Sequence, residues 1–202
     1  MPKPNLIQNV TFLGYADAKQ ADDPFKAAYE VARLCAQEGY TIVNGGGPGG
    51  MKASTMGAKS AGGKAIGVTF FPKDIPVFEG RDKTNKVDHL IVVENYLERT
   101  LKLLELGHIF VIFNGGTGTI SEFGMAWGLA RLYFGHHKPL ILYGEFWQEI
   151  IFAFTKGMYI RSEERNVFKI VNKPQAALDA IREFENIISN RNHRHKKPIF
   201  SI

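Results

Sequence analysis

The sequence predicts an α/β protein with a single domain: a doubly wound, Rossmann-like parallel sheet with helices on both faces. Short apolar runs rich in Val, Ile and Phe alternate along the chain with helical patterns of about 10 to 15 residues. This alternation is typical of a parallel sheet whose strands are buried on both faces. The 202 residues are enough for one well-buried domain.

The expected strands and helices follow from the apolar runs and from the residues that end them. The strands are expected at residues 10–13, 40–43, 65–70, 89–93, 109–113 and 139–143, and the helices at residues 24–37, 51–60, 96–106, 123–132, 146–156 and 174–188. Pro24 suits the first turn of the first helix, and Gly39 ends it. The polar, aperiodic segment 71–87 is either a loop over the site or a surface connection. We expect one domain over residues 1–188 and a basic tail over residues 189–202.

The net charge of +5 comes mostly from the end of the chain. Arg191, Arg194, Lys196 and Lys197 lie there without an acidic residue, while the other basic residues nearly balance the 20 acidic ones. Such a tail could touch nucleic acid or a membrane surface, but a solvated end is the simpler interpretation. We therefore do not expect a nucleic-acid partner.

Cysteine use and apolar runs bear on the compartment. Cys35 is the only cysteine, which excludes an intramolecular disulfide, and its apolar neighbours indicate a buried structural thiol. There is no apolar signal region, and no apolar run approaches the ~20 residues of a membrane helix. The six histidines have no spacing typical of a zinc site. We expect a cytoplasmic protein with no membrane partner and no metal.

The stretch from residue 115 to residue 122 carries the strongest functional information. Its phosphate-binding candidates are Gly115, Gly116, Thr117, Gly118 and Thr119. A glycine-rich turn between a strand and a helix exposes backbone N–H groups at the positive end of the helix dipole, which suits a phosphate. Glu122 is expected in the first helical turn, where its carboxylate could act as a catalytic acid or base. The stretch therefore predicts a nucleotide-like ligand.

A second glycine-rich turn covers residues 45–50 and supplies Gly46 and Gly47 as binding candidates, with packing as the alternative role. It is not a Walker A loop, because no Gly-Lys-Ser/Thr follows. Gly14 follows the first strand without the spacing of a dinucleotide fingerprint. All three turns follow strand ends, so we expect them to form one composite site at the carboxyl edge of the sheet.

Two further side chains have competing interpretations. Arg99 lies off the apolar stripe of its helix, so the pattern alone predicts a solvated surface arginine. Trp127 could stack on a base, but core packing or a subunit contact is the simpler role.

Together, these motifs resemble those of the LONELY GUY (LOG) family. That family has a Gly-Gly-Gly-Pro-Gly-x-Met-like turn, an arginine, and a Pro-Gly-Gly-x-Gly-Thr-x-x-Glu motif fifteen residues later. This chain has the first turn at residues 45–51, Arg99, and Asn-Gly-Gly-Thr-Gly-Thr-Ile-Ser-Glu at residues 114–122. The similarity runs from about residue 10 to residue 184.

The resemblance implies hydrolysis of the N-glycosidic bond of nucleoside 5′-monophosphates, among them cytokinin ribotides, to a free base and ribose 5-phosphate. It implies Arg99 and Glu122 as the catalytic pair and residues 115–119 as the phosphate site. It further implies that no metal or organic cofactor is needed and that the protein is a homodimer or a larger homo-oligomer. A carboxylate beside C1′ suits this chemistry, because positive charge builds on the ribose as the bond breaks.

Several residues depart from the family pattern. Asn114 replaces a proline, Thr100 replaces a lysine, Lys52 stands where an acid is common, and Tyr15 stands where a serine is usual. These departures leave a second hypothesis open, a non-catalytic carrier of a nucleotide or of molybdenum cofactor on the same fold. A lysine decarboxylase is disfavoured, since no motif points to pyridoxal phosphate.

Overall fold

The computed structural model describes residues 7–72, 81–133 and 137–190. These residues form one seven-stranded sheet in the order β4-β3-β2-β1-β5-β6-β7, and each pair of neighbouring strands is parallel. The strands are β1 (Asn9–Leu13), β2 (Thr41–Asn44), β3 (Ala65–Phe70), β4 (His89–Val93), β5 (Ile109–Ile112), β6 (Leu140–Tyr143) and β7 (Phe168–Val171). The helices are α1 (Asp23–Gln37), α2 (Gly49–Ser60), α3 (Tyr96–Leu106), α4 (Thr117–Leu132), α5 (Phe146–Gly157) and α6 (Pro174–Asn190), with a 3-10 turn η1 (Ser162–Val167).

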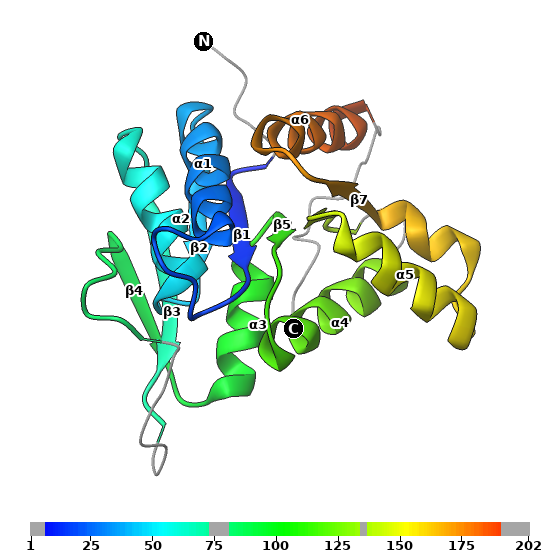
Figure 1. Ribbon diagram of the computed structural model, residues 1–202, viewed down its shortest axis with the longest axis horizontal. Coiled ribbons are helices and arrows are strands. Elements are labelled where there is room, and N and C mark those ends of the chain that lie inside the picture. The colour runs from blue at the N-terminus through cyan, green and yellow to red at the C-terminus, as the bar shows by residue number, and fades with distance from the viewer. Residues whose placement is uncertain (1–6, 73–80, 134–136, 191–202) are drawn as a thin grey trace.

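Helices cover both faces of this sheet, which confirms the predicted α/β fold (Figure 1). Val10 and Phe12 of β1 pack in a core cluster with α1, α2 and α6. Phe110 and Ile112 of β5 pack in the opposite cluster with α3, α4 and α5. Successive side chains of a strand point to opposite faces of the sheet. Because helices cover both faces, the side chains on both faces are buried. This explains why the strands are continuously apolar rather than alternating.

The strand order reverses between β1 and β5. β1 pairs with β2 on one side and with β5 on the other, and the helices that follow β1 and β5 lie on opposite faces. The loops after these two strands therefore diverge. In an open parallel sheet this divergence leaves a crevice at the carboxyl edge, where ligands bind.

The start of α4 was predicted wrongly from the sequence. The predicted helix 123–132 begins at Thr117, directly after Gly116, whose backbone is extended. Glu122 therefore lies in the second turn of α4 rather than in the first. Glycine disfavours a helix, but the buried side chains of Thr119, Glu122 and Phe123 fix these first turns by tertiary packing.

The other predicted boundaries differ less from the observed ones, and one strand was not predicted. The strand predicted at 40–43 is shifted by one residue, and the helix predicted at 51–60 begins two residues earlier, at Gly49. β7 was not predicted, because its four residues are only partly buried and Lys169 interrupts the apolar run. Of the predicted loop and tail, residues 73–80 and 191–202 lie outside the described residues. Among the helices of the described ranges, none has both the length and the apolar character that a membrane crossing requires.

Candidate active site

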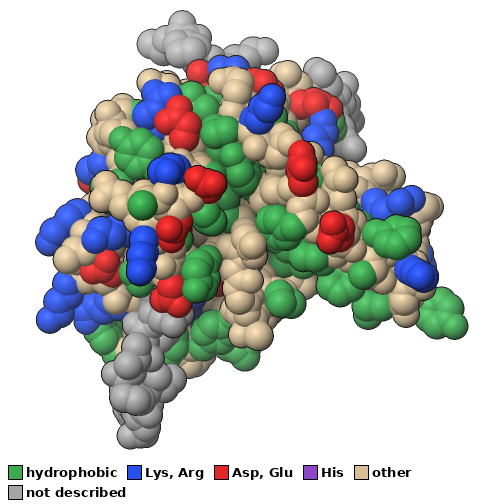
Figure 2. Space-filling view, in the orientation of Figure 1, with side chains coloured by type: hydrophobic (Ala, Val, Ile, Leu, Met, Phe, Trp, Pro, Cys, Tyr) green, Lys and Arg blue, Asp and Glu red, His purple; other side chains and the backbone are tan. Residues whose placement is uncertain are grey.

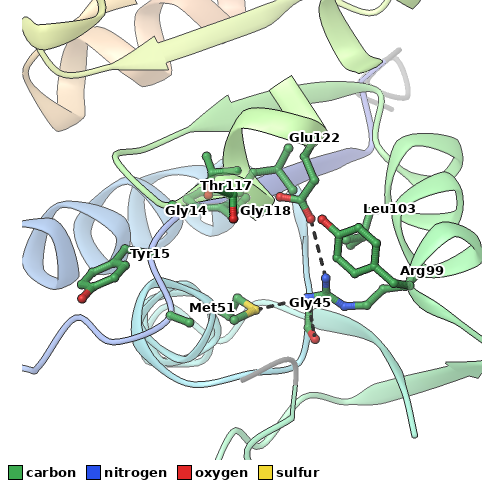
Figure 3. Close-up of a pocket in the computed structure, with 15 residues that line it drawn as sticks. Gly14, Tyr15, Gly45, Met51, Arg99, Leu103, Thr117, Gly118 and Glu122 are labelled. Atoms are coloured by element: carbon green, nitrogen blue, oxygen red, sulfur yellow. Dashed lines mark hydrogen bonds and ion pairs between the residues drawn. The ribbon is translucent and has the colours of Figure 1, made fainter. Parts of the chain in front are cut away.

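A cavity of about 340 Å³ opens at the carboxyl edge of the sheet, where the strand order reverses (Figure 3). Its volume lies in the usual range for small-molecule sites. Its lining residues come from the end of β1, from α2, α3 and α4, and from the loops after β1, β2 and β5: Phe12, Leu13, Gly14, Tyr15, Ala16, Gly45, Met51, Tyr96, Arg99, Leu103, Gly116, Thr117, Gly118, Thr119 and Glu122. All three predicted glycine turns therefore contribute to one cavity.

Arg99 is buried, so the interpretation as a solvated surface residue was wrong; its side chain is 8% exposed. Its Nε donates a hydrogen bond to the carbonyl of Val68 (3.0 Å), and its Nη2 donates to the carbonyl of Gly45 (3.3 Å). Nη2 also contacts the sulfur of Met51 at 3.6 Å. The loop after β2 and the backbone of β3 thus hold the guanidinium in one orientation, and Nη1 is left to face Glu122.

The start of α3 determines where Arg99 points. The side chain of Asn95 accepts a hydrogen bond from the backbone N–H of Glu98 (2.9 Å) and so caps the helix. Glu98 in turn accepts from the backbone N–H of Glu94 (3.1 Å). This reciprocal arrangement resembles a capping box, which fixes the first turn of a helix. Arg99 follows directly and is therefore preorganised.

Gly45 is required for this arrangement. A Cβ atom at this position would lie 1.7 Å from Nη2 of Arg99 and 2.6 Å from the sulfur of Met51, so the guanidinium would have to leave its position. The glycine therefore lets the guanidinium approach the backbone of the loop after β2.

Glu122 pairs with Arg99 inside the cavity. The distance from Nη1 of Arg99 to Oε1 of Glu122 is 3.6 Å, and Figure 3 shows the two side chains pointing toward one another from α3 and α4. Burial raises the pKa of Glu122 to about 7, and the positive charge of Arg99 opposes this rise. Burial likewise lowers the pKa of Arg99, and Glu122 opposes that change. A carboxyl with a pKa near neutrality is suited to proton transfer.

The first turn of α4 forms another wall. Gly116, Thr117, Gly118 and Thr119 line the cavity, and no side chain caps this helix end. The first N–H groups of a helix lack intrahelical partners, so they can bind an anion. Gly115 does not line the cavity, but a Cβ atom there would lie 2.1 Å from Oγ1 of Thr119. It therefore allows the turn to close onto that threonine.

Two candidates from the second glycine turn lie outside the cavity lining. The backbone N–H of Gly46 donates to the side chain of Asn44 (2.8 Å), and its carbonyl accepts from the N–H of Asp82 (3.0 Å). The carbonyl of Gly47 accepts from the side chain of Asn85 (2.8 Å). In this structure, the two glycines join the turn to the segment after residue 80, and Gly45 is the part of the turn that faces the cavity.

Sequence reasoning missed Tyr96 as a lining residue. Its hydroxyl lies 2.9 Å from Oγ of Ser121, which ties the start of α3 to α4 beside the Arg99–Glu122 pair. Its position three residues before Arg99, on the same helical face, was the available clue. Trp127 does not line the cavity; it packs on Phe123 and donates to the carbonyl of Glu164 (2.7 Å), as the packing interpretation predicted.

Of the four residues that depart from the LOG pattern, one lines the cavity. Tyr15 lines the cavity. Thr100 is fully buried and bonds to the carbonyl of Tyr96 (3.1 Å), while Lys52 pairs with Asp82 (3.4 Å); neither lines the cavity. The carbonyl of Asn114 accepts the N–H of Tyr15 (2.9 Å) and so links the loops after β1 and β5.

Cys35 is buried, as expected of a structural thiol. In the part of the chain that the structure describes, no three His, Cys, Asp or Glu side chains are grouped so that they could hold a metal ion.

Comparison with known families decides the assignment. The profile of the SLOG cluster4 family matches residues 7–177. The chain belongs to the SLOG cluster4 family. The cytokinin riboside 5′-monophosphate phosphoribohydrolase of Mycobacterium tuberculosis is 34% identical over 117 residues, which are 57% of this chain and 59% of that enzyme. The resemblance to LOG proteins is thereby confirmed, although the alignment spans less than two thirds of that enzyme.

Solved structures share the fold of this SLOG cluster4 protein. The molybdenum cofactor binding protein of Rippkaea orientalis has a TM-score of 0.65 at 24% identity, with 88% of this chain and 97% of that chain covered. The Moco carrier protein of Chlamydomonas reinhardtii has a TM-score of 0.63 at 22% identity, with 91% and 99% covered. At these identities the likeness concerns the fold alone.

Proposed function

We propose that the protein hydrolyses the N-glycosidic bond of nucleoside 5′-monophosphates and releases a free base and ribose 5-phosphate. The observation that carries this proposal is the buried Arg99–Glu122 pair, which faces the cavity beside the uncapped start of α4. The mycobacterial relative that is named as a phosphoribohydrolase supports the same reaction class.

The 5′-phosphate would bind at the start of α4. Backbone N–H groups and the hydroxyls of Thr117 and Thr119 provide donors there, and the helix dipole favours the negative charge. Arg99 adds the one formal positive charge among the described residues that line the cavity. Binding of the phosphate would fix the ribose against Glu122, so that binding energy remote from the reacting bond serves catalysis.

Glu122 would act on the anomeric carbon. As the bond between C1′ and the base nitrogen breaks, positive charge builds on the ribose, and an adjacent carboxylate stabilises it. The same carboxylate can accept a proton from the attacking water, whose oxygen bonds to C1′; a proton passes to the departing base. Arg99 holds the carboxylate in place through their 3.6 Å ion pair.

The alternative is a non-catalytic carrier of a nucleotide or of molybdenum cofactor, which the fold likeness to two such proteins suggests. Glu122 argues against it. A buried carboxylate repels a bound phosphate, and a protein that only binds an anionic ligand gains nothing from this repulsion. An enzyme that stabilises a cationic ribose does gain from it.

One experiment separates the two functions. Wild-type protein and Glu122→Gln are titrated calorimetrically with AMP, and free base is followed by chromatography with AMP, GMP, CMP, UMP and isopentenyl-AMP. The hydrolase predicts base release that is lost in the variant, while AMP still binds. Tight binding without turnover, unchanged by the substitution, would support the carrier.

We also propose that the protein forms a homodimer. Leu97 and Leu101 of α3 and Ile120 of α4 are exposed apolar side chains on two helices that contribute to the cavity lining, at 57%, 37% and 58% exposure. Exposed apolar groups that lie close together often mark subunit contacts. Sedimentation equilibrium of wild type and Leu97→Glu tests this point, since the charged variant should be monomeric.

A further inference from the structure

A second cavity opens at the carboxyl edge of the sheet, at the ends of β5, β6 and β7. Its volume is about 540 Å³, and it shares no lining residue with the candidate active site. Its apolar lining residues are Pro24, Ala27, Phe113, Tyr143, Phe146 and Pro174. Figure 2 shows apolar side chains between the part of the molecule that carries α1 and α2 and the part that carries α5.

Three aromatic rings line this cavity. The rings of Phe113 and Tyr143 lie 4.9 Å apart between centroids, and Phe146 lines the same cavity. Such rings bind another flat aromatic system by stacking or edge contact. The amides of Asn114 and Asn172 lie in the lining as well. Asn172 already donates to the carboxylate of Glu145, and the other hydrogen-bonding positions of an amide suit ring heteroatoms. This combination suits an aromatic heterocycle.

The charged residues of the lining restrict the class of ligand that the second cavity can bind. The charged residues of the described lining are Asp23, Lys26 and Glu30, and each already has a partner: Lys26 pairs with Asp23 (3.7 Å), and Glu30 accepts two hydrogen bonds from Arg33. The lining therefore offers no unpaired cation to a phosphate or a carboxylate. An uncharged ligand fits this lining better than a nucleotide.

We propose that the second cavity binds an uncharged aromatic heterocycle of the free nucleobase class. Bases of this class are also the product of the proposed hydrolysis, so adenine is chosen as the probe on the strength of that proposed function. The site itself depends only on the lining of the second cavity. Phe113 and Asn114, which line it, directly precede the glycine turn that begins at Gly115.

The test measures adenine binding by calorimetry and saturation-transfer NMR. Ala27→Trp fills the cavity from α1, and Tyr143→Leu removes a stacking face; Gln37→Trp, at the exposed end of α1, is the matched control. Circular dichroism establishes that each variant is folded. We expect adenine to bind about 10-fold or more weakly in both cavity variants, because stacking area is lost, and normally in Gln37→Trp.

The same titration is repeated with saturating AMP in the Glu122→Gln background, and AMP should not displace adenine. The proposal is overturned if adenine does not bind at millimolar concentration, if Tyr143→Leu binds it like wild type, or if AMP displaces it fully. A failure of AMP to bind or to be cleaved would count against the proposed hydrolase alone, because comparison of the cavity variants needs no AMP.

Discussion

Replacing Glu122 with glutamine should change how the stability of the protein depends on pH. Burial raises the pKa of Glu122 in the folded protein to about 7, against an ordinary value of 4.5 that it regains on unfolding. Between these values the folded protein binds more protons than the unfolded chain, so its stability falls as the pH rises. From pH 5 to pH 8 this loss amounts to about 2–3 kcal/mol. Glutamine does not titrate, so the variant should not show this loss.

Urea unfolding of wild type and Glu122→Gln at pH 5 and pH 8 measures the effect. The free energy of unfolding of wild type, relative to that of the variant, should be about 2–3 kcal/mol lower at pH 8 than at pH 5. Glu149→Gln, on the exposed side of α5, is the control for the substitution itself. If the free energy of unfolding of wild type, relative to that of the variant, were the same at both pH values or higher at pH 8, burial would not dominate the environment of Glu122.

The remaining predictions concern activity toward nucleoside monophosphates. Gly45→Ala should reduce kcat/KM by about 100-fold in steady-state assays, because a Cβ atom 1.7 Å from Nη2 displaces Arg99. Arg99→Lys should fold, as circular dichroism would show, yet lose activity by a similar factor, since lysine cannot make the hydrogen bonds to Val68 and Gly45 and also face Glu122. Nucleosides without the 5′-phosphate should be poor substrates, with the loss seen in kcat as well as in KM. The pH profile of kcat/KM should rise through about pH 7 as Glu122 ionises; a flat profile from pH 5.5 to pH 8.5 would exclude it as the base.

The fold was predicted well because the signals for its strands and turns lie in short, continuous stretches of sequence. Continuous apolar runs such as Ile109–Ile112 indicated strands buried on both faces, and the glycines after them indicated the carboxyl edge. The missed strand, β7, lacks this property: it is at the edge of the sheet, and none of its residues is fully buried. Its position depends on pairing with β6, which no local pattern records.

The candidate site was predicted less completely, because its decisive contacts are long-range. Helical periodicity predicted that Arg99 would be solvated, yet carbonyls from two strand-end segments more than 30 residues away in sequence bury it. Only the resemblance to a family predicted a catalytic role for Arg99. The raised pKa of Glu122 also depends on burial beneath α3 and the glycine loops, which spacing along the chain does not reveal. The helix start at Thr117 was missed because glycines that favour a loop in isolation are held in a helix by packing.

In the proposed function, the Arg99–Glu122 pair cleaves the bond between ribose and base. The most direct measurement follows free base and ribose 5-phosphate together in one reaction, with each of the five monophosphates as substrate. We expect equal amounts of both products from at least one of them, and a loss of about 100-fold or more in Glu122→Gln. No base from any of the five, or equal rates for wild type and the variant, would rule out this hydrolysis.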